Sequence, residues 1–222
     1  MVRKITALRN KRGGGKRVNI FLDGKLAFSL EAEVAAKEGL SLEQVLPDER
    51  VEALLRLDNI RRGLNAALHY LGYRPRSESE LRDRLRRRGF DVDTIGAVIT
   101  RLREQKLIDD VAFAQFWAEN RESFSPRSQW LTGLELRQKG IPSDIIEQVV
   151  NVVDDQDNAY RAALSKALNL PRTDYESFRR RLGSYLRRRG FSYEVISHTV
   201  GRLWQEGVAL KVEGSQDEVF IA

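Results

Sequence analysis

The 222-residue sequence predicts a mainly α-helical protein, with three tandem three-helix repeats in an elongated, curved array and a small β-hairpin or sheet in front of them. Three observations support this prediction. A pattern that recurs about every 50 residues covers most of the chain. Apolar residues follow the helical period inside each copy, whereas alternation typical of strands is confined to the first thirty residues.

The N-terminal segment has the signals of a hairpin followed by short helices. Asp23 and Gly24 separate two runs rich in β-forming residues, which is a strong hairpin signal. The pattern then becomes helical and reaches Gly39, a residue type that commonly ends helices. A further helical stretch begins at Pro47. We therefore expect residues 1–58 to form a small β-sheet with two short helices.

The internal repeat becomes visible when Gly89, Gly140 and Gly190 are aligned. A leucine lies four residues before each glycine, an apolar residue directly after it, an acid four residues later, and apolar residues six and thirteen residues later. The matched residues are Leu85, Leu136 and Leu186; Phe90, Ile141 and Phe191; Asp93, Asp144 and Glu194; Ile95, Ile146 and Ile196; and Leu102, Val153 and Leu203. Such a repeat indicates stacked helical units.

Each repeat has the residues that end one helix and begin the next. Gly89 can adopt the left-handed backbone that closes a helix, and Asp91 can then cap the N-terminus of the following helix. Ser192 is in the capping position of the third repeat. Pro142 is in that position in the second repeat, where we expect the cap to move to Ser143.

A third amphipathic stretch precedes each helix pair and completes a three-helix unit. These stretches are residues 60–71, 110–121 and 155–168. We expect an N-terminal domain at 1–58, repeats at 59–109, 110–154 and 155–211, and an acidic tail at 212–222.

Composition excludes several classes of protein. The absence of cysteine excludes disulfides and thiolate metal sites. No apolar run approaches the roughly 20 residues that span a bilayer, and no apolar signal-peptide core follows the basic start, so we expect a cytoplasmic protein without membrane attachment. The net charge of +6 alternates along the chain, with basic blocks at 1–30, 61–109 and 161–211 and acidic blocks between them. Such blocks favour nucleic acid or an acidic protein as partner, or a well-solvated surface.

Triple arginines end two of the aligned helices, in "LRDRLRRRGF" (81–90) and "LGSYLRRRGF" (182–191). Cations near a helix C-terminus interact favourably with the helix dipole, so one interpretation is structural. The middle repeat has fewer charges at the same place, so a second interpretation is a surface for an anionic partner. The candidate partner-binding or DNA-binding residues are Lys16, Arg17, Arg82, Arg86, Arg87, Arg88, Arg180, Arg187, Arg188 and Arg189.

The remaining motifs point to no catalytic chemistry. "GGGKR" (13–17) is not a phosphate-binding P-loop, because Arg17 replaces the required Ser or Thr; it is either a flexible turn or a hairpin tip whose cations touch phosphate. His69 and His198 are expected on helix surfaces, and the aromatic residues at 113–119 and Trp130 in packing positions. We expect no enzyme activity, no metal and no cofactor.

Three separated segments resemble the RecX regulatory proteins. They are "RSESELRDRLRRRGF" (76–90), "LIDDVAFA" (107–114) and "ELRQKGI" (135–141), in the order and spacing of that family. The resemblance covers roughly residues 1–207. Thr132 departs from the pattern, since an aliphatic residue is usual there, and we expect Trp130 to compensate.

The resemblance implies a function in DNA repair, recombination and the SOS response. RecX-like proteins bind the RecA recombinase filament on single-stranded DNA and restrain its ATPase, strand exchange and coprotease activity. It implies a monomer whose partners are the RecA filament and single- or double-stranded DNA. The alternative is a direct DNA binder that uses helix–turn–helix-like pairs. An enzyme such as a nuclease is a distant third hypothesis.

Overall fold

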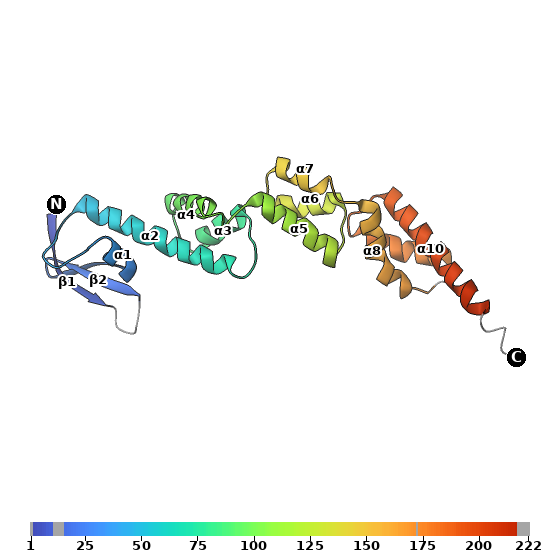
Figure 1. Cartoon of the computed structure of the whole chain (residues 1–222), viewed down its shortest axis with the longest axis horizontal. Helices are drawn as coiled ribbons and strands as arrows, with labels where there is room; N and C mark the ends of the chain where they lie inside the picture. Colours follow the sequence, from blue (N-terminus) through green and yellow to red (C-terminus); the bar gives the residue numbers. More distant parts are fainter. Residues whose placement is uncertain (1, 11–15, 172, 217–222) are drawn as a thin grey trace. The chain divides into compact units, whose positions relative to one another are not determined.

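The computed structural model divides the chain into two compact units, residues 1–108 and 109–222 (Figure 1). It describes residues 2–10, 16–171 and 173–216, with side chains as far as residue 207. Within this part of the chain, no helix combines the length and the apolar character needed to cross a bilayer.

The first unit begins with a four-stranded antiparallel sheet in the order β3-β2-β1-β4. The strands are β1 (Val2–Asn10), β2 (Arg17–Leu22), β3 (Lys25–Glu31) and β4 (Val45–Pro47). Asp23 and Gly24 form the turn between β2 and β3 with φ values of 50° and 79°, so the predicted hairpin is confirmed. Strand β4 was not expected, because three residues are too few to show alternation.

Helices complete the first unit, which has two separate hydrophobic cores. They are α1 (Ala32–Lys37), α2 (Asp48–Leu71), α3 (Glu78–Arg87) and α4 (Val92–Glu104). The N-terminal part of α2 contributes Leu54 to the core of the sheet, and its C-terminal part packs on α3 and α4 with Leu64 (Figure 1). The two helical stretches expected on either side of residue 58 are therefore one continuous helix of 24 residues. Residue 58, where we expected a domain boundary, lies inside it.

The second unit contains the second and third repeats. The helices of the second repeat are α5 (Asp110–Phe124), α6 (Gln129–Gln138) and α7 (Ser143–Val150). Those of the third are α8 (Asp155–Leu168), α9 (Tyr175–Arg187) and α10 (Tyr193–Gln216). Helix α10 continues into the segment that we expected to be an acidic tail; residues 217–222 of that segment lie outside the described residues.

The aligned glycines end their helices as predicted. Gly89, Gly140 and Gly190 have φ values of +82°, +74° and +86°, in the left-handed region where other residues are strained. Each follows the last turn of α3, α6 or α9. The repeat pattern therefore marks the helix ends correctly in all three copies.

The expected caps are present in two of the three repeats. Asp91 accepts a hydrogen bond from the backbone N–H of Thr94 at 2.7 Å, and this bond lowers the pKa of the Asp91 carboxyl. Ser192 accepts one from the N–H of Val195 at 3.3 Å. The expectation for Ser143 was wrong: Pro142 itself has the extended backbone of an N-cap, and Ser143 is the first helical residue.

The aromatic residues only partly occupy packing positions. Phe113 is buried, and Trp117 lies half-buried against the same core. Trp130 is 66% exposed, so it does not compensate for Thr132, which is itself buried. The expectation that Trp130 fills a core position was therefore wrong.

Candidate functional site

The arginines at the end of α3 differ in their partners. Arg82 donates from Nε to Glu78 at 2.7 Å, and Arg86 donates from Nη1 to Asp83 at 2.7 Å. Arg87 donates from Nε to the carbonyl oxygen of Asp83 at 3.2 Å. Two of the first repeat's candidate cations therefore face a carboxylate of their own helix.

Arg88 is an available cation at the end of α3. It is exposed, and no carboxylate among the described residues lies within ion-pair distance of it. It lines an open hollow of about 420 Å³ formed by Glu31, Arg62, Asn65, Ala66, His69, Arg88 and Phe90. The hollow thus brings together Arg62 of α2 and Arg88 at the end of α3. His69 is exposed, as is His198 on α10, which agrees with the expectation for both histidines.

Helix α9 carries the more open set of arginines. Arg179 is paired with Glu176 at 2.9 Å, and this hydrogen bond raises the pKa of Arg179. Arg180, Arg187 and Arg188 are exposed, and no carboxylate in the described ranges forms an ion pair with them. Two of these, Arg180 and Arg187, line a groove between α9 and α10.

Arg189 has a structural role between the second and third repeats. It donates from Nη1 to the Ser125 hydroxyl at 3.1 Å and to the Pro126 carbonyl at 3.0 Å. Its own carbonyl accepts from the N–H of Ser128 at 3.0 Å. A Cβ on the adjacent Gly190 would lie 2.5 Å from the Ser128 Oγ, so the two repeats approach closely here. Arg189 is therefore already committed to intramolecular contacts.

Arg17 lies inside a polar network, whereas residues 11–15, which precede Lys16, lie outside the described part of the chain. Its guanidinium donates to both carboxylate oxygens of Asp58, at 2.9 and 3.4 Å. Asp58 is 4% exposed and also accepts from the N–H of Glu31 at 2.6 Å. This carboxylate joins β2 and β3 to α2. Lys16, directly before Arg17, remains exposed.

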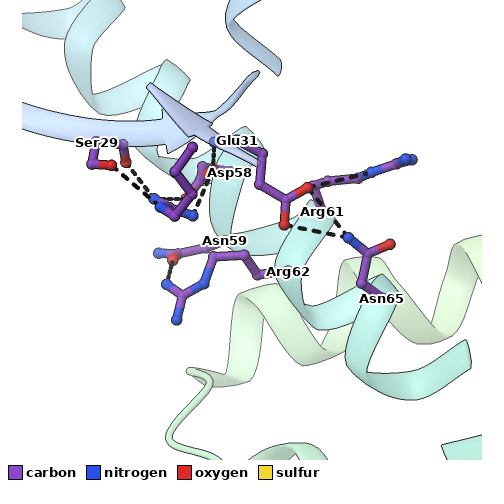
Figure 2. A network of polar contacts seen from close by, with 8 residues as sticks. Ser29, Glu31, Asp58, Asn59, Arg61, Arg62 and Asn65 are labelled. Carbon is purple, nitrogen blue, oxygen red and sulfur yellow. Dashed lines mark hydrogen bonds and ion pairs between the residues drawn. The ribbon is translucent and has the colours of Figure 1, made fainter. Parts of the chain in front are cut away.

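The network continues along α2 at the surface. Glu31 accepts from the side-chain amide of Asn65 at 3.3 Å and lies 3.8 Å from Arg61 (Figure 2). Arg61 also pairs with Glu33 on α1. These contacts attach the end of β3 to the middle of α2. Arg62, the next residue of α2, lines the hollow described above.

Sequence reasoning missed one repeated motif. Pro-Arg-Ser occurs at 75–77 and again at 126–128, and each serine caps the next helix. The arginines of both copies point to a glutamate of that helix: Arg76 lies 3.9 Å from Glu80, and Arg127 pairs with Glu135. Burial lowers the pKa of Arg127. The repeated triplet before a helix was the signal that could have revealed these contacts.

Known proteins share the three-helix domains of this chain. Residues 64–102, 109–150 and 154–200 match the first, second and third three-helix domains of RecX, in that order.

Curated relatives extend the match over most of the chain. A regulatory protein RecX of Bacillus subtilis strain 168 is 31% identical over 91% of this chain and 78% of its own length. A regulatory protein RecX of Listeria welshimeri is 30% identical over 86% of this chain and 72% of its own length.

Solved structures agree with the sequence matches. A crystal structure of a regulatory protein RecX superposes with a TM-score of 0.65 at 25% identity, over 89% of this chain and 98% of that one. The RecX of Lactobacillus salivarius gives a TM-score of 0.58 at 28% identity, over 66% of this chain and 97% of that one. The chain therefore belongs to the RecX family of regulatory proteins.

Proposed function

We propose that this protein is a negative regulator of the RecA recombinase. It binds the RecA filament on single-stranded DNA and restrains ATP hydrolysis, strand exchange and coprotease activity. The observation that carries the proposal is the tandem match of three RecX three-helix domains, which together cover more than half of the chain. The regulated process is DNA repair, recombination and the SOS response.

The arrangement of charge supports an anionic partner. A filament on DNA presents phosphates and acidic side chains, and exposed arginines without an internal partner are suited to both. Arg17 and Arg189 are engaged within the protein, and Arg82 is paired with Glu78. Arg86 is likewise paired with Asp83. The cations proposed for partner binding are Lys16, Arg87 and Arg88 in the first unit and, as a separate set, Arg180, Arg187 and Arg188 in the second.

A second candidate function is direct binding of duplex DNA. Each repeat contains two helices joined by a short glycine-bearing turn, for example α3 and α4 around Gly89, which is the layout of a helix–turn–helix pair. This function requires tight binding to isolated duplex with a preference for sequence. A filament regulator binds isolated duplex weakly and with steep salt dependence.

Charge reversal in the first repeat tests the proposed partner surface. We expect Arg87→Glu/Arg88→Glu to weaken co-sedimentation with RecA filaments on single-stranded DNA by about tenfold or more, because like charges across an interface are strongly unfavourable. The matched control is Arg101→Glu/Lys106→Glu, which makes the same charge change at exposed cations of the same unit. Equal binding of the test variant and the wild type would show that these arginines do not contribute to partner binding. Failure of the wild-type protein to bind any RecA filament would overturn the function.

A further inference from the structure

We propose that the groove between α9 and α10 of the third repeat binds the sugar–phosphate backbone of single-stranded DNA directly. The inference goes beyond the proposed function, since it assigns a DNA contact that does not need RecA. It depends on a cavity, on the arginines that line it, and on a comparison with the same place in the other two repeats.

The groove has the volume of a small-ligand site. Its volume is about 320 Å³, which lies within the range of small-ligand sites. The lining residues are Glu176, Arg179, Arg180, Gly183, Ser184, Arg187, Tyr193, Ile196, Ser197 and Val200. Ile196 and Val200 are buried beneath the groove, whereas Arg180, Arg187, Ser184 and Ser197 are exposed. The groups available to a ligand are therefore mainly polar.

Charge in the groove is largely uncompensated. Glu176 is the single carboxylate among its lining residues, and it pairs with Arg179. Arg180 and Arg187 have no ion pair in the described part of the chain. The nearest compensation is Asp174, the N-cap of α9, whose pKa is lowered by its hydrogen bonds with Ser177 and also by the charge of Arg180. Guanidinium groups bind phosphate with strong, charge-assisted hydrogen bonds, so the pair of Arg180 and Arg187 is suited to a phosphodiester.

The first repeat shows how such a groove is closed. Arg82 replaces Gly183, seven residues before the aligned glycine, and Asp83 replaces Ser184. Asp83 pairs with Arg86, the counterpart of Arg187, at 2.7 Å. The first repeat therefore neutralises the arginine that the third repeat leaves available.

The second repeat has apolar side chains at two of the corresponding positions. Trp130 replaces Arg180 and Leu134 replaces Ser184, although Arg137 keeps the position of Arg187. Only the third repeat combines both arginines with small, polar neighbours. Gly183 is not itself distinctive, because the second repeat has Gly133 at the same position with a matching isoleucine contact. The charge and the polar lining are therefore what is specific to α9 and α10.

Tyr193 favours single-stranded DNA over an acidic peptide. It lines the groove at the start of α10 and is 71% exposed. An exposed aromatic ring beside a basic groove is the arrangement on which unpaired bases stack, and every base has a face to offer. An acidic peptide would use the arginines but not this ring.

Binding of a fluorescent oligo(dT) by the full-length protein, without RecA, tests the inference. We expect Arg180→Ala/Arg187→Ala to weaken binding about tenfold or more. The slope of log K against log salt concentration should become shallower by about 1.4, since each lost phosphate contact removes about 0.7. The matched control is Lys166→Ala/Arg181→Ala, which removes two exposed cations of the same repeat outside the groove. We expect this control to bind within about twofold of the wild type.

Three further variants test the chemistry of the groove at constant fold. Ser184→Asp reproduces the pair of Asp83 and Arg86 and should weaken oligo(dT) binding as the double variant does. Tyr193→Ala should weaken it by about tenfold, within the range for one stacked base, whereas Tyr193→Phe should retain it. Circular dichroism checks that each variant is folded.

Three outcomes would overturn the inference. If the double variant Arg180→Ala/Arg187→Ala binds oligo(dT) with wild-type affinity, the groove is not the binding site. If the test and control variants lose equal affinity, binding depends on overall charge and not on a defined site. The third outcome assigns the groove to an acidic protein segment. In this outcome polyglutamate displaces oligo(dT) from the wild-type protein, while the groove variants bind oligo(dT) as tightly as the wild type does. Because RecA is absent from the assay, none of these outcomes affects the proposed regulation of RecA.

Discussion

At the scale of single residues, the hydrogen-bond acceptors around an arginine decide what it can do. Arg17 faces the buried Asp58, 41 residues away in sequence, and is a structural cation. Arg189 bridges two repeats through Ser125 and Pro126. Arg180, identical in chemistry, faces the groove without an ion pair in the described residues. The sequence analysis named all three as candidates, because the sequence shows the arginines but does not reveal which distant residues contact two of them after folding.

Removal of the buried carboxylate should be costly. We expect Asp58→Ala to lower the free energy of unfolding of the first unit by about 3–5 kcal/mol, because it leaves the Arg17 guanidinium without its partner. It also leaves the N–H of Glu31 without an acceptor. Urea denaturation measures this loss.

An exposed ion pair on the same helix provides the control. Arg56 and Glu52 lie 3.7 Å apart with side chains 73% and 71% exposed, and Arg56→Ala should cost less than about 1 kcal/mol. Similar small losses in both variants would show that Asp58 does not hold the sheet to α2.

At the scale of helices and strands, local signals were reliable where one residue decides the conformation. Gly89, Gly140 and Gly190 end their helices, and Asp91 caps α4. Signals that depend on distant packing were less reliable. Helix α2 is continuous across residue 58 because no glycine or proline interrupts it between residues 48 and 62. Strand β4 exists because it pairs with β1, which the sequence of residues 45–47 does not reveal.

Two glycines should respond to alanine with opposite signs. Gly89→Ala places a side chain at φ +82° and should lower the free energy of unfolding by about 1–2 kcal/mol. Gly96→Ala lies inside α4, where a Cβ meets nothing within 4 Å, and should raise it by about 0.5–1 kcal/mol. Thermal or urea unfolding of both variants checks the signs. Wild-type stability of Gly89→Ala would contradict the assigned role of Gly89, and destabilisation by Gly96→Ala would contradict the prediction for α4.

At the scale of the whole molecule, three copies of one pattern carry different surfaces. The first repeat pairs several of its cations internally, as in Arg82 with Glu78. The second carries fewer arginines at its helix end, and the third leaves Arg180 and Arg187 open in a groove. The shared core residues could be predicted from the repeat, since they recur at fixed spacing. The differences between the surfaces could not, because each depends on the few residues that surround an arginine after folding.

The central claim is that this member of the RecX family restrains RecA. The most direct test is RecA's hydrolysis of ATP on single-stranded DNA, titrated with this protein at two salt concentrations. We predict loss of hydrolysis at substoichiometric protein, because a regulator that caps or disassembles filaments affects many RecA subunits for each molecule bound. Unchanged hydrolysis at saturating protein, with the cognate RecA and at both salt concentrations, would contradict the account.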